Sequence, residues 1–182
     1  RSPSRGLGDV YKRQVLCLAA HPDDVEYGML GSIMKYTDTK FDILVLSEGG
    51  NFDESTSTNR HSECETIWEG IDNITGHFLP IKHLADVSED ELINTIESKF
   101  NISDYDSIFT PPLEDAHFEH RQVNRASFSL VRRIQCGLVT FRTPSALEDW
   151  IPNFYVDLTK NTTETGAIIM FAKKKALLNF ES

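Results

Sequence analysis

Short apolar runs alternate along the chain with longer segments in which apolar residues recur every three or four positions. The runs predict strands over about residues 14–20, 41–46, 77–80, 106–110, 138–141 and 154–158. The recurring spacing predicts helices over about 27–37, from 60 onward, from 88 onward, from about 117 onward and over 164–180. This alternation predicts an α/β fold, a single domain with a mostly parallel sheet flanked by helices.

Two local features add detail to this pattern. Ser88, with Glu91 three residues later, has the capping-box arrangement that marks the first turn of a helix. The polar stretch over 47–59 is long for a connection inside a compact domain, so we expect a loop there and a helix that begins at Arg60. Such a loop is either a lid over a site or simply mobile.

The chain has 182 residues, a formal net charge of −10 and an isoelectric point near 5.0. That length suits one domain, and the negative charge argues against nucleic acid and anionic membranes as partners. Cys17, Cys64 and Cys136 are widely spaced, so they indicate neither a thiolate zinc site nor a disulfide framework. We therefore expect a reducing, cytoplasmic location, and the longest apolar run, 167–172, is too short to span a membrane.

The two ends of the chain differ from the rest. Residues 1–13 carry positive charge without an apolar segment, which is not the pattern of a secretory signal, and we expect them to be non-native or disordered. The predicted domain therefore covers residues 14–182. Its last helix stops abruptly at Ser182, so we expect the C-terminus to be truncated.

Two groups of chemically active side chains follow predicted strands. His21, Asp23 and Asp24 come directly after the first strand, and His117 and His120 open the helix after the fourth. Because the carboxyl ends of parallel strands meet at one edge of a sheet, we expect the two groups to lie together. Adjacent carboxylates repel each other unless a cation neutralises them or a substrate needs them. Two imidazoles and a carboxylate form the ligand set of a catalytic zinc ion, so the sequence predicts a metal site.

The same residues carry a resemblance to a known family. The strand ending in AHPDDVEYG, followed by DAHFEHRQVNRA, resembles the PIG-L/LmbE-like zinc-dependent N-acetylglucosamine deacetylases over residues 14–182. The resemblance implies a Rossmann-like domain with Zn²⁺ held by His21, Asp24 and His120, and with Fe²⁺ as an alternative metal. It also implies that Asp23 is the general base, and that His117 stabilises the oxyanion or protonates the leaving amine.

Further residues gain a role, most of them through this resemblance. Arg60, which opens an Arg-x-x-Glu pattern, would contact hydroxyl or phosphate oxygens of the substrate. Glu48 is a further candidate on its own residues, since the Glu48-Gly49-Gly50 stretch can offer backbone amides to substrate, although Gly-Gly is equally typical of a plain turn. Asp115 and Glu119 would lie behind the metal ligands and orient the histidines.

The second motif departs from the family pattern. The family usually reads His-Pro-Asp-His, whereas Phe118 and Glu119 stand in the middle here. Glutamate is longer than aspartate, so we expect the partner that orients His117 to differ. Leu30 also stands where the family commonly has a glycine behind the first turn.

These features together predict a metal-dependent hydrolase that removes the N-acetyl group from an N-acetylglucosamine-type amino sugar conjugate. Zinc would polarise the amide and activate water, with Asp23 taking the proton. The partner would be that small molecule, and the sequence leaves homo-oligomerisation open.

Other interpretations stay open at this point. A catalytically silent sugar-binding relative would keep the same residues without turnover. A non-haem iron enzyme would use His21, Asp23 and His120 as two histidines and one carboxylate. A signalling receiver domain also carries paired aspartates after its first strand, with Asp86 loosely placed as the phosphoacceptor. In the simplest case Asp23 or Asp24 caps the following helix and His21 is a turn residue.

Overall fold

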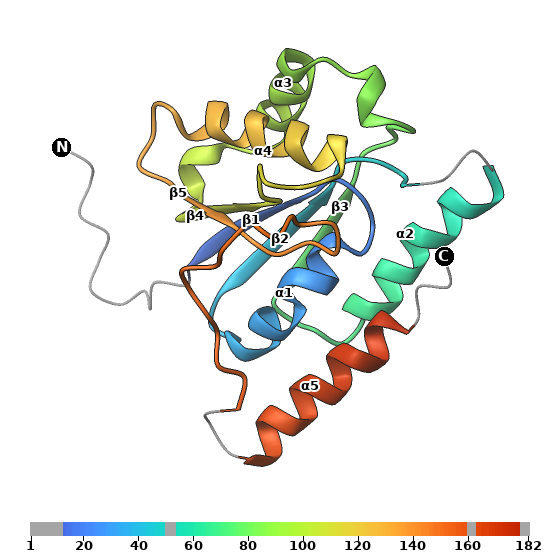
Figure 1. The fold of residues 1–182 in the computed structure, drawn as a ribbon, viewed down its shortest axis with the longest axis vertical. Coiled ribbons are helices and arrows are strands. Elements are labelled where there is room, and N and C mark those ends of the chain that lie inside the picture. Colours follow the sequence, from blue (N-terminus) through green and yellow to red (C-terminus); the bar gives the residue numbers. More distant parts are fainter. Residues whose placement is uncertain (1–12, 50–53, 160–162, 179–182) are drawn as a thin grey trace.

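The computed structural model describes residues 13–49, 54–159 and 163–178. The segment expected to be non-native or disordered, 1–13, therefore lies outside the described residues except for its last position. Within the described ranges, a five-stranded, fully parallel sheet has the order β3-β2-β1-β4-β5 (Figure 1). Its strands are β1 Gln14–Ala19, β2 Lys40–Val45, β3 Ile74–Phe78, β4 Ser107–Thr110 and β5 Gly137–Thr140.

Helices cover both faces of this sheet. They are α1 Asp24–Lys35, α2 Glu54–Trp68, α3 Glu89–Lys99, α4 Phe118–Val131 and α5 Thr163–Leu177, with short 3₁₀ helices η1 Leu84–Asp86 and η2 Ile102–Asp104. α3 and α4 lie on one face and α1 and α2 on the other, with α5 packed along α1 (Figure 1). The predicted α/β fold with a parallel sheet is confirmed. In the part of the chain that the structure describes, no helix is both long and apolar enough to cross a membrane.

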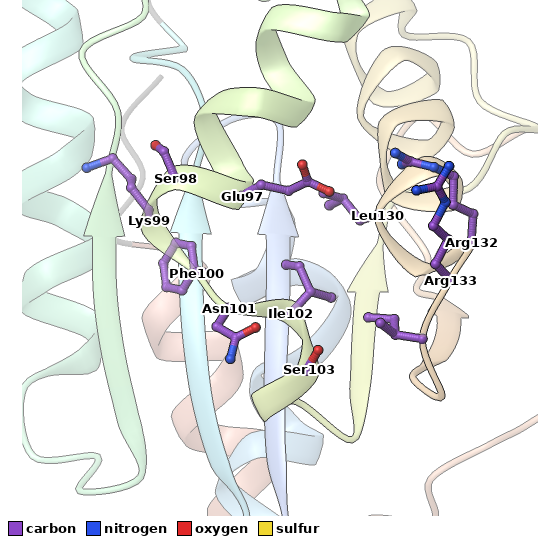
Figure 2. Close-up of a pocket in the computed structure, with 11 residues that line it drawn as sticks. Glu97, Ser98, Lys99, Phe100, Asn101, Ile102, Ser103, Leu130, Arg132 and Arg133 are labelled. Carbon is purple, nitrogen blue, oxygen red and sulfur yellow. The ribbon is translucent and has the colours of Figure 1, made fainter.

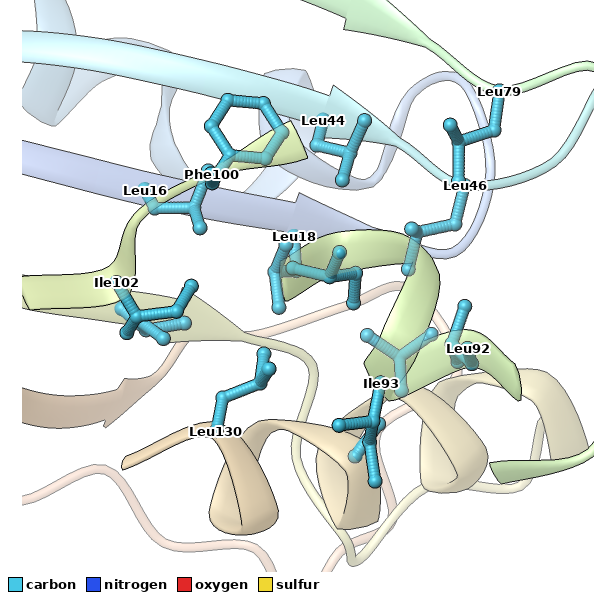
Figure 3. Close-up of a cluster of buried hydrophobic side chains, with 14 of the residues drawn as sticks. Leu16, Leu18, Leu44, Leu46, Leu79, Leu92, Ile93, Phe100, Ile102 and Leu130 are labelled. Atoms are coloured by element: carbon cyan, nitrogen blue, oxygen red, sulfur yellow. The ribbon is translucent and has the colours of Figure 1, made fainter. Parts of the chain in front are cut away.

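Strand β1 is buried on both faces because its alternate side chains enter two different cores. The core toward α3 and α4 is built mainly from leucine and isoleucine: Leu16, Leu18, Leu44, Leu92, Ile93, Ile96 and Leu130 (Figure 3). The core toward α1 and α2 contains Val15, Cys17, Met29, Leu30, Ile33, Ile43, Cys64 and Trp68. Burial raises the pKa of the Cys17 and Cys64 thiols, so both act as small, unreactive core side chains.

The strand order places a topological switch between β1 and β4. From β1 the chain moves outward through β2 and β3, and it then returns to β4 on the other side of β1. Open α/β sheets form their binding sites where the connections leave two adjacent strands in opposite directions. The turn after β1 and the start of α4 both follow strands at this switch, so the fold brings the two predicted groups to one place.

The start of α3 agrees with the sequence pattern. Ser88 Oγ accepts a hydrogen bond from the backbone N–H of Glu91 at 3.2 Å. This bond satisfies one of the amides that the first turn leaves without a helical partner. The predicted N-cap is therefore confirmed.

The predicted start of the second helix is wrong. α2 begins at Glu54 rather than at Arg60, so the connection after β2 is much shorter than expected. Residues 54–59 are rich in Ser and Thr and lack apolar periodicity, which is typical of a loop. A helix held by buried residues further along can extend into such a stretch, because each added residue gains a backbone hydrogen bond.

The third strand is displaced from its predicted position. β3 spans Ile74–Phe78 rather than 77–80. It is an edge strand with threonine, glycine and histidine at its centre, so apolar residues mark only its ends. Its backbone pairing with β2 sets the position that the side-chain pattern leaves undefined.

The strand predicted over 154–158 is absent from the structure of those residues. This segment runs beside α1 instead, where Leu158 lies so close to Gly31 that an added Cβ would approach it to 2.6 Å. Lys35 Nζ donates a hydrogen bond to the Asp157 carbonyl in the same region. Leu158, the last apolar residue of this segment, therefore packs against a helix, whereas Phe154 at its start is largely exposed.

Candidate metal centre

The turn after β1 has an unusual backbone at Asp23. Residues His21-Pro22-Asp23 lead from the buried strand into α1, which starts at Asp24. Asp23 has φ 100°, and among the described residues it is the one non-glycine residue with a positive φ. That region costs an L-residue about 1–3 kcal/mol, and it is kept mainly where the surroundings hold it at functional sites.

Neither aspartate of the turn caps the helix through its side chain. Asp23 occupies the N-cap position of α1 but makes no side-chain cap bond. Asp24 Oδ2 accepts the backbone N–H of His21 at 2.9 Å, which closes the turn instead of the helix end. The simple helix-cap interpretation is therefore wrong for both residues.

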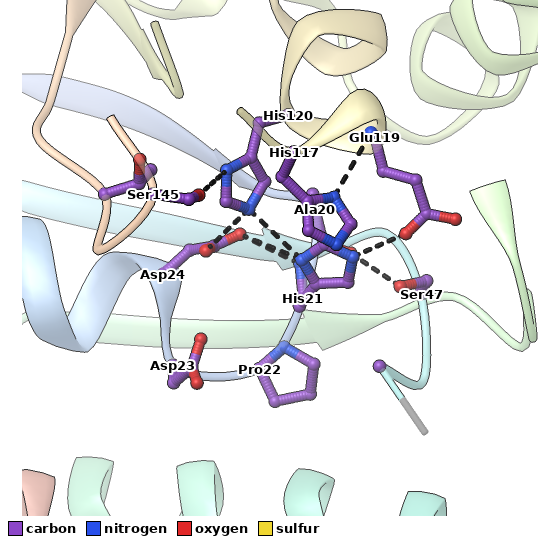
Figure 4. Close-up of polar contacts among 12 residues, drawn as sticks. Ala20, His21, Pro22, Asp23, Asp24, Ser47, His117, Glu119, His120 and Ser145 are labelled. Atoms are coloured by element: carbon purple, nitrogen blue, oxygen red, sulfur yellow. Dashed lines mark hydrogen bonds and ion pairs between the residues drawn. The ribbon is translucent and has the colours of Figure 1, made fainter. Parts of the chain in front are cut away.

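The second group is positioned by the start of α4. His117 is the N-cap residue, and its Nδ1 accepts a hydrogen bond from the backbone N–H of Glu119 at 3.3 Å. His120 lies in the first turn and is almost fully buried, with 3% of its surface exposed. Its ring points toward the turn after β1 (Figure 4).

His21, Asp24 and His120 converge from these two elements. His120 Nε2 lies 3.0 Å from Asp24 Oδ1 and 3.2 Å from His21 Nδ1. His21 Nδ1 lies 3.8 Å from Asp24 Oδ2. Figure 4 shows the three side chains facing one another. The structure thus brings His120 to His21 and Asp24, although His21 and His120 are 99 positions apart in the sequence.

Each of the two imidazoles has a carboxylate on its outer nitrogen. His21 Nε2 lies 2.5 Å from Glu119 Oε2, and His120 Nδ1 lies 2.9 Å from Asp115 Oδ2. A neutral ring that donates one N–H to a carboxylate keeps a lone pair on its other nitrogen. The inner nitrogen of His21 would offer its lone pair directly, and that of His120 would do so once a cation displaces the proton that it shares with Asp24. Two nitrogen lone pairs and a carboxylate that converge form a donor set for Zn²⁺ or Fe²⁺, so these residues fit the predicted metal.

The same contacts shift the pKa values of the site. Burial alone would lower the pKa of His120, but hydrogen bonds and charges from Asp24 and Asp115 outweigh it and raise the pKa to about 9. Burial would raise the pKa of Asp24, yet the hydrogen bond from His120 and the nearby imidazoles lower it. The site therefore favours positive charge between Asp24 and His120, which also stabilises a bound cation.

A different set of three donors includes His117. Ring nitrogens of His21, His117 and His120 lie within 4.8 Å of one another, which is close enough for one ion. His117 Nδ1, however, already accepts the Glu119 N–H. Partial burial and the neighbouring His21 and His120 lower the pKa of His117, so the ring is neutral at pH 7 and carries its proton on Nε2. That nitrogen is a hydrogen-bond donor, which suits a developing negative charge better than a cation.

Asp115 is the centre of a buried hydrogen-bond network that also holds His120. Its Oδ1 accepts the His117 backbone N–H at 2.7 Å and Ser145 Oγ–H at 2.7 Å, and Thr143 Oγ1 donates to Oδ2. Burial would raise the pKa of Asp115, but these hydrogen bonds lower it. Sequence patterns missed Thr143 and Ser145, because a short Thr-Pro-Ser loop resembles any turn. The pairing of β4 with β5 places that loop beside the site.

Arg60 holds the Asp23 carboxylate. Arg60 Nη2 lies 2.8 Å from Asp23 Oδ2 and donates to the Pro22 carbonyl at 2.9 Å, while Nη1 donates to the Gly49 carbonyl at 2.5 Å. Burial and the Asp24 charge raise the pKa of Asp23 to about 6, although Arg60 opposes this shift. The guanidinium is thus engaged inside the protein, and its contact with substrate stays a prediction.

Glu48 lies at the same edge of the sheet as the cluster. Its backbone N–H donates to the Ile81 carbonyl at 2.8 Å, and its side chain is half-buried. Ser47 Oγ donates to the Ala20 carbonyl at 2.7 Å, which ties the loop after β2 to the turn after β1. The residue that ends the predicted Glu-Gly-Gly turn, Gly50, lies outside the described residues, so the substrate role of Glu48 stays a prediction.

Two cavities lie away from the histidine–carboxylate cluster. One of about 590 Å³ lies at the ends of α3 and α4, with Glu97, Arg132 and Arg133 in its lining (Figure 2). Another, of about 970 Å³, lies beside β4, β5 and α1 and is lined in part by Trp150 and Phe154. Neither includes a member of the histidine–carboxylate cluster. The chemistry of the donor set, and not cavity size, therefore identifies the site.

Comparison with known proteins gives a family and a set of similar folds. The family model described as PIG-L, GlcNAc-PI de-N-acetylase, matches residues 16–131. N,N'-diacetylchitobiose deacetylase from Pyrococcus horikoshii is similar at 20% identity and a TM-score of 0.63, over 93% of this chain and 72% of that one. A zinc-inhibited form of teicoplanin deacetylase is similar at 10% identity and a TM-score of 0.64, over 91% and 83%. The 4-carboxy-2-hydroxymuconate hydratase from Pseudomonas putida is similar at 15% identity and a TM-score of 0.65, over 93% and 79%.

These structures share the fold of this chain. Their sequence identities are too low to show a shared function. One of them is a hydratase, so the architecture serves more than one reaction. The family model is more specific, because it matches more than half of the chain and includes both groups of site residues. The chain therefore belongs to the PIG-L family, as its two motifs predict.

Proposed function

We propose that this protein is a metal-dependent deacetylase that removes the N-acetyl group from an N-acetylglucosamine-type amino sugar conjugate. The observation that carries the proposal is the convergence of His21 Nδ1, His120 Nε2 and the Asp24 carboxylate, with contacts of 3.0 to 3.8 Å. A second carboxylate, Asp23, is adjacent in the chain and is held separately by Arg60. Metal ligands beside a distinct base are the arrangement that metal-dependent amide hydrolysis uses.

His21, Asp24 and His120 would hold the ion, Zn²⁺ or Fe²⁺, through the donor atoms that face one another. Bound there, a divalent cation would polarise the amide carbonyl and lower the pKa of a water molecule towards neutrality. A similar structure is described as a zinc-inhibited form of its enzyme, so both metals and limiting metal concentrations belong in any test.

Asp23 is the general base in this proposal. With a pKa of about 6, its carboxylate is ionised at neutral pH and still basic enough to accept the proton of an attacking water. Arg60 fixes the direction of the carboxylate through a 2.8 Å contact. A correctly placed base contributes about a hundred- to ten-thousandfold to the rate.

Of the two roles that the family resemblance allows for His117, stabilisation of the oxyanion fits its neutral ring. Its ring centroid lies 4.5 Å from that of His21 and 4.9 Å from that of His120, so it borders the cluster. Its Nε2–H can donate to the carbonyl oxygen as negative charge develops there. The proton that Asp23 accepts from the attacking water passes on to the departing amine, so the step balances and neutral His117 keeps its own Nε2–H.

The acetamido sugar as substrate rests on family membership. The family is described as GlcNAc-PI de-N-acetylase, and one similar structure is a diacetylchitobiose deacetylase. We infer from these descriptions that a small amino sugar conjugate is the substrate. We also infer a cytoplasmic location, because Cys17, Cys64 and Cys136 are free thiols, which a reducing compartment maintains.

The test is acetate release by the purified chain after reconstitution with Zn²⁺ or with Fe²⁺. A panel of N-acetylglucosaminides should yield acetate with metal and none after chelation. Asp23→Asn should abolish turnover and keep the metal, because an amide cannot accept the proton. Asp24→Ala and His120→Ala should lose both metal and turnover. Glu114→Gln, an exposed carboxylate beside Asp115, is the control and should change neither.

Each other outcome points to a different conclusion. No acetate from any member of the panel, with metal bound, would contradict the proposed reaction. Metal and sugar bound without turnover would favour a catalytically silent relative. Hydration of an unsaturated carboxylic acid would favour the reaction named for the Pseudomonas putida protein. Turnover that survives Asp23→Asn would exclude Asp23 as the base.

A further inference from the structure

We propose that Glu119 is a positioning residue that fixes the tautomer of His21 and ties the metal centre to η1. The inference deepens the proposed function and rests on its metal centre. Glu119 is adjacent in sequence to His120 and lies two residues after His117. The oxygens of its carboxylate, however, contact His21 and the backbone of Ala85.

One oxygen of Glu119 sets the proton position on His21. Glu119 Oε2 lies 2.5 Å from His21 Nε2, and each side chain is only 13% exposed, so water competes little for this hydrogen bond. An ionised carboxylate only accepts hydrogen bonds, so His21 must donate from Nε2. His21 Nδ1 then keeps its lone pair, 3.2 Å from His120 Nε2 on the inner side of the cluster (Figure 4).

The other tautomer of His21, with its proton on Nδ1, could not bind a cation at this site. A neutral imidazole carries its proton on either ring nitrogen, and a neighbouring hydrogen bond decides which one. With the proton on Nδ1, His21 would present an N–H to Asp24 and His120 and would offer no lone pair to a cation. The hydrogen bond to Glu119 excludes the Nδ1–H tautomer of His21 before any metal binds.

The other oxygen anchors Glu119 itself. Glu119 Oε1 accepts the backbone N–H of Ala85 at 3.1 Å. Ala85 belongs to η1, where the preceding residue, Leu84, is fully buried in the core toward α3 and α4. The carboxylate is therefore held between a core-anchored backbone and the imidazole, and His21 takes its orientation from an element far from it in sequence.

The length of the Glu119 side chain allows its carboxylate to contact both His21 and Ala85. The family motif usually has aspartate here, whose carboxylate would lie one carbon–carbon bond, about 1.5 Å, closer to the helix. A retreat of that size takes at least one of the contacts, 3.1 Å to Ala85 or 2.5 Å to His21, beyond hydrogen-bond distance. Glu119→Asp therefore tests whether the length of the side chain matters. Glu119→Gln keeps that length and tests whether the negative charge matters.

The first experiment reads the tautomer without added metal. Ring ¹⁵N chemical shifts of His21, recorded at mildly alkaline pH with a chelator present, distinguish a protonated from an unprotonated nitrogen. The wild type is expected to show the Nε2–H tautomer, and Glu119→Ala a mixture of both. Glu114→Ala, which removes an exposed carboxylate from the loop before α4, should match the wild type. A pure Nε2–H tautomer in Glu119→Ala would overturn the proposal.

The second experiment measures zinc affinity by competition with a chromophoric chelator. Loss of a carboxylate behind a ligating histidine weakens metal binding about ten- to a hundredfold. We expect this loss for Glu119→Ala and Glu119→Asp, a smaller loss for Glu119→Gln, and none for Glu114→Ala. Wild-type affinity in both Glu119→Ala and Glu119→Asp would overturn the proposal. A wild type that binds no zinc would contradict the proposed function, and the tautomer measurement then decides the role of Glu119 by itself.

Discussion

Asp23 shows, at the scale of single residues, how the turn after β1 is held in an unfavourable conformation. Its φ of 100° is compensated by the guanidinium of Arg60, which binds the Asp23 carboxylate and two backbone carbonyls. One of these belongs to Gly49, where φ is 62° and an added Cβ would lie 2.7 Å from Pro22. Arg60 therefore clamps the loops after β1 and β2, and we infer that it acts on the reaction through Asp23.

Arg60→Gln should lower kcat more than it raises KM. Glutamine cannot bridge the two loops, so Asp23 loses its orientation, and kcat should fall about ten- to a hundredfold, part of what a general base contributes. Steady-state kinetics on an N-acetylglucosaminide that the wild type hydrolyses would measure this. Arg125→Gln, an exposed arginine on α4, is the matched control. A higher KM at constant kcat would instead support the sequence prediction that Arg60 contacts substrate.

Sequence patterns indicated the chemically active residues better than they indicated contacts. The meeting of the two groups follows from two motifs and the geometry of a parallel sheet, and the choice of His21, Asp24 and His120 among them follows from the family resemblance. The pairing of Glu119 with His21 does not, because it depends on how the start of α4 is rotated against the turn after β1. Thr143 was missed for the same reason, since only tertiary structure brings its loop to Asp115.

Among the secondary-structure elements, Trp68 of α2 joins its helix to both α1 and β3. Its Nε1–H donates to Glu26 Oε1 at 2.6 Å, which links α2 to α1 inside the core. Its ring covers Gly76 of β3 and stacks on Phe78 with centroids 5.4 Å apart. The packing of α2 thus depends on one indole ring, a buried carboxyl group and a glycine.

Glu26→Gln should change how stability depends on pH. Burial, together with the charges of Asp23 and Asp24, raises the pKa of Glu26 to about 7. A carboxyl group whose folded pKa is raised stabilises the fold below its unfolded pKa, and that contribution is lost as pH rises through the folded value. Glutamine still accepts the Trp68 N–H and never ionises. The variant should therefore match the wild type in acid and exceed its free energy of unfolding by up to about 3 kcal/mol above pH 7.

Urea denaturation at a series of pH values, with a chelator present to keep both proteins free of metal, measures the difference in free energy of unfolding between Glu26→Gln and the wild type. Glu65→Gln, an exposed carboxyl group on α2, should leave the pH dependence of the wild type unchanged. A Glu26→Gln variant that is less stable than the wild type in mild alkali would show that ionised Glu26 is favourable in the fold.

Gly76→Ala should destabilise the edge of the sheet. The added Cβ would lie 2.1 Å from the Trp68 ring, and this rigid, buried side chain can move only by disturbing its neighbours. Overpacking of this kind costs about 1–3 kcal/mol of unfolding free energy, which chemical denaturation would measure. Thr75→Ala, on the exposed neighbouring position, is the control. An unchanged midpoint for Gly76→Ala would mean that α2 packs loosely on β3.

Elements were predictable where a local pattern was strong. β1, β4 and the cap at Ser88 carry such patterns, and the structure has them close to the predicted positions. The start of α2 was not predictable, because a polar stretch joins a helix that packing stabilises further along. The segment 154–158 alternates like a strand but packs beside α1, which no local rule distinguishes from pairing in a sheet.

At the scale of the whole molecule, the strand order β3-β2-β1-β4-β5 joins the two motifs. A cation that bridges the turn after β1 and the start of α4 would cross-link two elements from opposite sides of the switch. Metal binding should therefore stabilise the entire domain, as any ligand that binds only the folded state does.

Zinc should raise the unfolding temperature of the wild type and of Asp23→Asn. At a hundredfold excess over the dissociation constant, binding adds about 2.7 kcal/mol to the free energy of unfolding. Asp24→Ala should unfold at the same temperature with and without zinc, because it lacks the central carboxylate. Thermal unfolding followed by circular dichroism, with chelator and with zinc, measures all three proteins. A zinc-dependent rise in Asp24→Ala equal to that of the wild type would place the ion elsewhere.

The most direct measurement is the anomalous scattering of zinc in a crystal of the reconstituted protein. We predict one ion about 2.0–2.2 Å from His21 Nδ1, His120 Nε2 and a carboxylate oxygen of Asp24. His117 should remain outside ligand distance and keep its hydrogen bond from Glu119. An ion bound by His21, His117 and His120 without Asp24, or no ion at this edge of the sheet, would contradict the proposed metal centre.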